Sequence, residues 1–127
     1  YGWILNNTID GADANCISPD ALQIIVQGNQ IRSCGSRGIA VDAGGDIQIL
    51  GNHVRGTAGS AITIRDGSHS DNNIMLGNFT SGGSHGINIS GSGAANNIAV
   101  GNRLSGASTS NYNNAGTNTT AAGNNTN

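Results

Sequence analysis

Two aspartates recur in this sequence at a spacing that suggests chemistry. Asp20 and Asp42 lie 22 residues apart, Arg65 follows Asp42 after 23 residues, and Asp66 is next to Arg65. If the chain repeats with this period, the first three side chains form one column on its surface. Two neighbouring carboxylates could act as acid and base in glycoside hydrolysis or bind Ca²⁺, with Arg65 and Asp66 contacting the substrate. The alternative is that the aspartates are solvated turn residues after a strand, where aspartate is common.

His85 is the third candidate catalytic residue, and Arg37 is a further candidate substrate-binding residue. His85 falls near the repeat position of Arg37 and Ser60, one strand edge away from the aspartates. A groove containing His85, Arg37 and Asp42 could bind and cleave a substrate, whereas an exposed turn histidine is the simpler explanation. His53 and His69 lie at turn or loop positions and lack the spacing of a metal-binding cluster, so the histidines predict no metal site.

These candidate residues belong to a repeat built on Asn-Asn or Gly-Asn pairs. The second residue of each pair, which is always Asn, recurs at intervals of 22, 23, 26, 24 and 22 residues. Nine or ten residues later, stretches such as GIAV, AITI and GINI alternate like a strand. Such units can bury their apolar side chains only by stacking, with strands about 4.8 Å apart. The aligned asparagines are then predicted to bond one another in a ladder. These anchor residues are Asn7, Asn29, Asn52, Asn78, Asn102 and Asn124.

The apolar residues before each anchor predict a local irregularity. In the second and third units they lie one residue earlier, relative to the anchor, than in the other three units. A shift of one residue turns a side chain to the opposite face of a strand. We therefore expect a bulge or an extra turn residue just before Gly28 and Gly51. In chain order the apolar pairs are Trp3/Leu5, Ile24/Val26, Ile47/Ile49, Ile74/Leu76 and Ile98/Val100.

The composition excludes several classes of protein. The chain has 21 Gly and 19 Asn but no Lys and no Glu, which argues against an α-helical fold. Its net charge is −2 and its five arginines are dispersed, so nucleic acid is not an expected partner. No apolar run approaches the roughly 20 residues of a membrane span. The two cysteines, Cys16 and Cys34, differ in their repeat positions, which favours two buried thiols over a disulfide.

Units reading xIxIxGNxI…GIxI resemble the right-handed parallel β-helix of the pectin lyase-like superfamily. That superfamily includes pectate lyases, polygalacturonases, mannuronan epimerases and phage tailspike depolymerases. The resemblance runs from Trp3 to about Asn124 and implies an all-β, right-handed, single-stranded parallel β-helix of about five rungs. Residues 1–127 would form one domain, which we expect to be the C-terminal part of a longer protein, with residues 105–127 as a degenerate terminal rung or cap.

The resemblance also implies a function. The expected protein is a carbohydrate-active domain, extracellular or on a virion surface, that belongs to a polysaccharide-degrading or polysaccharide-modifying enzyme. Polysaccharide is the expected partner, a homotrimer is the expected assembly if the chain is tailspike-like, and no cofactor is implied apart from Ca²⁺. The alternative is a non-catalytic stalk or glycan-binding module. Ice binding is disfavoured because the threonines do not fall in a regular column.

Overall fold

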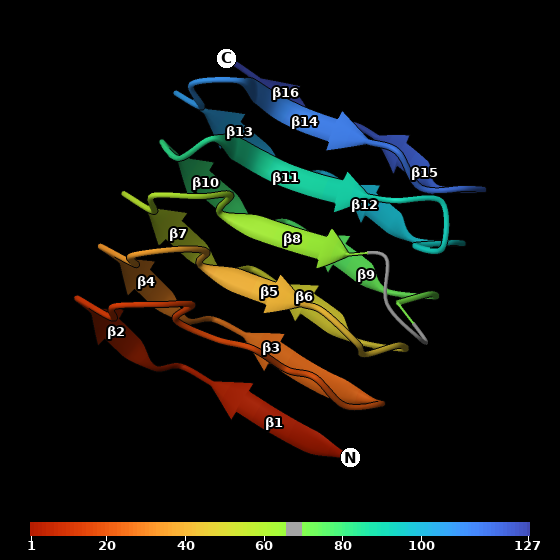
Figure 1. The fold of residues 1–127 in the computed structure, drawn as a ribbon, viewed down its shortest axis with the longest axis horizontal. Helices are drawn as coiled ribbons and strands as arrows, with labels where there is room; N and C mark the ends of the chain where they lie inside the picture. The colour runs from red at the N-terminus through yellow and green to blue at the C-terminus, as the bar shows by residue number, and fades with distance from the viewer. Residues whose placement is uncertain (66–69) are drawn as a thin grey trace.

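A computed structural model describes residues 1–65 and 70–127 and shows a parallel β-helix. Each turn of the chain adds a strand to each of up to three sheets, and no helix occurs in the described ranges. In Figure 1 the turns stack from the red N-terminal strand β1 to the blue C-terminal strands. Every pair of neighbouring strands is parallel, which confirms the predicted all-β solenoid of about five turns.

The three sheets are named A, B and C. Sheet A consists of β1 (Gly2–Leu5), β3 (Ile24–Gln27), β6 (Gln48–Leu50), β9 (Ile74–Leu76), β12 (Ile98–Val100) and β15 (Thr120–Ala122). Sheet B consists of β2 (Thr8–Asp10), β4 (Gln30–Arg32), β7 (His53–Arg55), β10 (Phe79–Ser81), β13 (Arg103–Ser105) and β16 (Asn125–Thr126). Sheet C consists of β5 (Ile39–Val41), β8 (Ile62–Arg65), β11 (His85–Ser90) and β14 (Ser110–Asn114).

Stacked aliphatic side chains fill the interior of the helix. In sheet C the isoleucines of successive rungs are direct partners, and Ile39, Ile62 and Ile87 are all fully buried. A second buried column, beginning with Val41, runs beside the first. Burial of each such side chain stabilises the fold by about 1.5–3 kcal/mol. The core therefore fixes which strand residues are left to face solvent, because alternate residues point to opposite faces.

The predicted asparagine ladder is present at the corner between sheets A and B. Asn52 Nδ2 donates to Asn78 Oδ1 over 3.1 Å and to the Val26 carbonyl oxygen over 2.8 Å. Its own Oδ1 accepts two bonds of 2.9 Å, from the backbone and side-chain amides of Asn29. The same side-chain-to-side-chain bond joins all six anchors from Asn7 to Asn124. The buried amides of the middle rungs are thus satisfied within the stack.

The predicted bulges before Gly28 and Gly51 are absent, and that prediction is wrong. Backbone pairing runs through sheet A without a shift. Gly28 and Gly51 have φ of 66° and 56°. Gly77, the equivalent glycine of a unit for which no bulge was predicted, has a similar φ of 63°. The side chains that alternate inward are Ile4, Val26, Ile49, Met75 and Ala99.

The apparent shift arises because two rungs have a polar residue at an inward position of sheet A and an apolar residue at the neighbouring outward position. Asn73 and Asn97 are fully buried and form a second, shorter ladder, in which Asn73 Nδ2 donates to Asn97 Oδ1 over 3.0 Å. Asn73 Oδ1 also accepts a 3.0 Å bond from the backbone amide of Ile47. Buried asparagines therefore continue the column of Ile47, and the apolar neighbours of these asparagines, such as Ile98, face outward.

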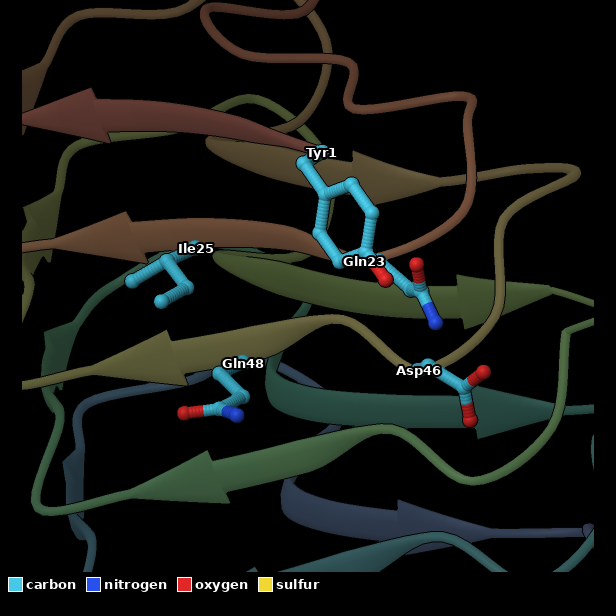
Figure 2. A pocket seen from close by; sticks show the side chains of 5 residues that line it. All are labelled: Tyr1, Gln23, Ile25, Asp46 and Gln48. Atoms are coloured by element: carbon cyan, nitrogen blue, oxygen red, sulfur yellow. The ribbon is translucent and has the colours of Figure 1, made fainter.

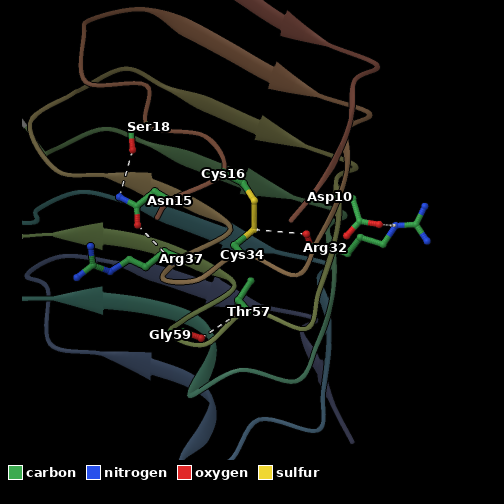
Figure 3. The surroundings of a disulfide bond; sticks show 9 residues. All are labelled: Asp10, Asn15, Cys16, Ser18, Arg32, Cys34, Arg37, Thr57 and Gly59. Carbon is green, nitrogen blue, oxygen red and sulfur yellow. Dashed lines mark hydrogen bonds and ion pairs between the residues drawn. A yellow bond between two sulfur atoms is a disulfide. The ribbon is translucent and has the colours of Figure 1, made fainter. Parts of the chain in front are cut away.

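The two cysteines form a disulfide, so the expectation of free thiols is wrong. Cys16 and Cys34 have Cα atoms 5.7 Å apart and are 18 residues apart in sequence (Figure 3). They are not partners in the strand ladder, because the backbone amide of Cys16 donates instead to the Arg37 carbonyl. The disulfide joins the first two rungs at positions that are not equivalent in the repeat. The offsets of the two cysteines from their anchors therefore did not reveal it.

Candidate functional site

The predicted column of charged residues lies on the outer face of sheet C. Asp42 directly follows β5, and Arg65 ends β8 in the next rung. Arg65 Nη1 is 3.4 Å from Asp42 Oδ1, and Arg37 Nη1 is 3.9 Å from Asp42 Oδ2. Asp20 Oδ1 accepts a 3.0 Å hydrogen bond from the backbone amide of Asp42. The repeat spacing therefore brings Asp20, Asp42 and Arg65 together, and the side chain of Arg37 reaches the same carboxylate from a different repeat position.

The charged cluster is open to solvent. The side chains of Arg37, Asp42 and Arg65 are 26%, 32% and 48% exposed. Exposed ion pairs of this kind contribute only about 0–1 kcal/mol to stability. The guanidinium groups can therefore exchange Asp42 for a carboxylate of a ligand at little energetic cost. Arginine suits this exchange because its planar fork of N–H donors matches a carboxylate.

His85 occupies the next rung of the same sheet and contacts two serines. Its Nδ1 lies 3.3 Å from Ser60 Oγ and 3.2 Å from Ser84 Oγ. In the tautomer that carries the proton on Nε2, a serine hydroxyl donates to Nδ1 and Nε2–H is free to donate to a ligand. Within the part of the chain that the structure describes, no carboxylate forms an ion pair with His85. The serine–histidine contact therefore lacks the acid of a catalytic triad.

A third column of side chains runs along sheet C between its two buried aliphatic columns. It begins with the buried Ala40 and Thr63 and continues through Asn88 and Asn113, which are partners in successive rungs. Asn113 Nδ2 donates to Asn88 Oδ1 over 2.8 Å, and both side chains are half-buried. The sequence did not single out these amides, although the position of Asn88 between the buried Ile87 and Ile89 places its side chain on the outer face.

The described residues of the charged cluster supply few of the ligands that Ca²⁺ prefers. Calcium takes six to eight oxygen ligands, several of them carboxylates. Two guanidinium groups face Asp42, and no group of three or more His, Cys, Asp or Glu residues with metal-binding geometry occurs in residues 1–65 and 70–127. Asp66, the remaining predicted substrate-binding residue, lies outside the described residues.

Comparison with known proteins agrees with this architecture. The family model described as a right-handed β-helix region matches residues 1–104. No curated protein and no solved structure matches the chain significantly. No helix in the described ranges is long and apolar enough to cross a membrane. The matched residues cover sheets A and B up to β13 and sheet C up to β11, and therefore include the whole charged cluster. The chain thus belongs to the right-handed β-helix family.

Proposed function

We propose that this chain is a carbohydrate-active β-helix domain that binds an acidic polysaccharide along the outer face of sheet C. The observation that carries the proposal is the convergence of Arg37 and Arg65 on Asp42 across two neighbouring rungs, at a partly exposed edge of this face. The arginines would bind uronate carboxylates, and Asp20 and Asp42 would accept hydrogen bonds from sugar hydroxyls. Asp20, Asp42 and Arg65 occupy equivalent positions in successive rungs about 4.8 Å apart, and would contact a glycan chain that lies across the rungs.

The proposed protein class is a polysaccharide-degrading or polysaccharide-modifying enzyme of the pectin lyase-like or tailspike type. Asp20, Asp42 and His85 would then be the candidate proton-transfer groups, with Ser60 and Ser84 fixing the ring orientation of His85. An extracellular or virion-surface location is part of the proposal, and the Cys16–Cys34 disulfide supports an oxidising compartment. A homotrimer remains a prediction, which the mass from light scattering tests.

Binding to defined glycans tests the proposal. Isothermal titration with polygalacturonate and with alginate should show saturable binding, whereas neutral dextran should not bind this face. Arg65→Ala should weaken binding about tenfold or more, because hydrogen bonds to charged groups contribute about 1.5–3 kcal/mol. Arg103→Ala is the matched control, since Arg103 lies on sheet B over the Phe79 ring, 5.3 Å from its centroid. Equal losses in the two variants would show that net charge, rather than this cluster, binds the glycan.

A cleavage assay separates an enzyme from a binding module. Release of new reducing ends, or of ultraviolet-absorbing unsaturated products, is measured for the wild type, Asp42→Asn and His85→Ala. Loss of product in both variants, with glycan binding retained, would assign the chemistry to this face. If the wild type cleaves and neither substitution slows it, these two residues have no catalytic role.

A rigid stalk is the second candidate function. The unbroken asparagine ladder and the disulfide between the first two rungs both stiffen the solenoid along its axis. A folded chain that binds neither acidic nor neutral glycans would favour this candidate.

A further inference from the structure

The outer face of sheet A has a character unlike that of sheet C. Trp3, Leu5, Leu76 and Ile98 are 68%, 43%, 48% and 38% exposed, although they lie in regular strands. We call this surface the sheet A strip. None of its outward positions carries a charge; in chain order they are Trp3, Leu5, Ile25, Gln27, Gln48, Leu50, Ile74, Leu76, Ile98, Val100, Thr120 and Ala122.

A shallow cavity of about 310 Å³ lies at the N-terminal end of the sheet A strip. Its lining residues come from the first three rungs: Tyr1, Gln23, Ile25, Asp46 and Gln48 (Figure 2). Trp3 is not one of the lining residues, but it lies on the same outer face as the strand partner of Ile25, which in turn is the partner of Gln48.

The corner residues of the cavity are held by the backbone of the fold. Gln23 and Asp46 both have positive φ, of 61° and 55°, at the equivalent corner of successive rungs. The backbone amide of Gln23 donates to the Gly45 carbonyl over 3.1 Å, and that of Asp46 donates to the Asp71 carbonyl over 3.1 Å. The backbone that carries the side chains of Gln23 and Asp46 is therefore fixed before a ligand binds. This lowers the conformational entropy lost on binding.

The width of the sheet A strip favours a narrow ligand. Its strands of three or four residues give a width of roughly 12 Å, and successive strands are spaced about 4.8 Å apart. An extended linear molecule can use such a strip fully.

We propose that the N-terminal end of the sheet A strip is a second glycan-binding site, specific for a neutral polysaccharide strand. Tyr1 and Trp3 supply aromatic rings against which the C–H faces of sugar rings pack. Gln23, Gln48 and Asp46 supply amide and carboxylate groups that hydrogen-bond sugar hydroxyls.

The charge at this site selects against uronates. No arginine lines the cavity, and Asp46 repels a carboxylate on the ligand. This site lies on a different sheet from the charged cluster and does not rest on the function proposed for sheet C.

Intrinsic fluorescence tests the site directly, because Trp3 is the only tryptophan in the sequence. The purified chain is titrated with cellohexaose and with mannohexaose, two neutral oligosaccharides, and with hexagalacturonate. We expect at least one neutral sugar to shift the Trp3 emission saturably to shorter wavelength, since the ring is now 68% exposed, and hexagalacturonate to leave it unchanged. Calorimetry with the same sugar should show at least about tenfold weaker binding for Trp3→Ala and Gln48→Ala.

Two control variants and one mass measurement decide the outcome. Leu76→Ala removes an equally outward side chain from the sheet A strip away from the cavity, and Arg65→Ala disables only sheet C; both should bind the neutral sugar as the wild type does. The proposal is overturned if neither neutral sugar moves the emission, or if Arg65→Ala abolishes the response. It is also overturned if light scattering shows that the unliganded chain associates and Trp3→Ala abolishes that association, because the strip would then be an interface between copies.

Discussion

Sheets A and C are built from the same rungs yet present opposite surfaces. The outer face of sheet C gathers Arg37, Asp42, Arg65 and His85, whereas the outward strand positions of sheet A carry no charge and expose Trp3. Both faces are held by one interior of stacked aliphatic residues and asparagine amides. The comparison teaches that the repeat sets the positions of outward side chains, while their chemistry varies independently from sheet to sheet.

Disrupting the shared interior should damage both faces together, and Asn52→Ala is expected to have the largest effect. This substitution removes four side-chain hydrogen bonds and leaves buried partners unsatisfied. At about 1 kcal/mol per bond, the free energy of unfolding should fall by about 4 kcal/mol. Urea denaturation measures the loss, and Asn7→Ala at the exposed end of the ladder is the control, with a much smaller loss expected.

Removal of the disulfide should weaken the N-terminal rungs, where the cavity of sheet A and Asp20 both lie. The double substitution Cys16→Ser and Cys34→Ser opens a loop of 18 residues, for which chain entropy predicts a loss of about 3 kcal/mol. Urea denaturation of the double variant is compared with that of the wild type with and without reductant. A wild type whose stability is unchanged by reduction would contradict a structural role for this bond.

Salt should separate the two faces without any mutation. Raising ionic strength from about 0.01 M to about 1 M shortens the Debye length from about 30 Å to about 3 Å. Binding of an acidic glycan to sheet C should then weaken by about tenfold or more, while a neutral glycan on sheet A should bind equally well. Calorimetry at both salt concentrations measures this difference, and equal salt dependence for the two glycans would contradict it.

Acid should destabilise the fold slightly through His53, which lies in sheet B. Because His53 is on neither proposed binding face, its effect on unfolding can be measured separately from effects on binding. Burial, and then the nearby charge of Arg55, lower the pKa of His53 below 6.5. The unfolded state therefore binds the proton more readily, so this contribution to stability is present above pH 6.5 and is lost as the pH falls toward the folded pKa. His53→Gln should flatten part of the pH dependence of unfolding between about pH 7 and pH 5. A variant with the same slope as the wild type would assign that dependence to other groups.

The fold could be read from the sequence because one position in each unit repeats strictly. The asparagine anchors and the isoleucines of sheet C keep their spacing through the rungs, and both features are confirmed. The position three residues before each anchor is also apolar in every unit, from Ile4 to Ala121. That column gives the true register of sheet A, and the error came from following the larger outward residues, such as Trp3 and Leu76.

The candidate site was only partly predictable. Asp42, Arg65 and Asp20 share one offset from their anchors, so their proximity follows from the period. The contacts of His85 with Ser60 and Ser84, and the cavity beside Trp3, depend on side-chain directions at corners, which the period does not determine. The Cys16–Cys34 bond was missed for the same reason, because it joins residues that are not ladder partners.

One measurement tests the central claim that the two outer faces act independently: calorimetry of Arg65→Ala and Trp3→Ala, each titrated with polygalacturonate and with the neutral oligosaccharide. We predict that Arg65→Ala loses only the acidic glycan and that Trp3→Ala loses only the neutral one, each by about tenfold or more. If either substitution weakens both glycans equally while the unfolding free energy stays unchanged, the two faces do not bind separately and the account is contradicted.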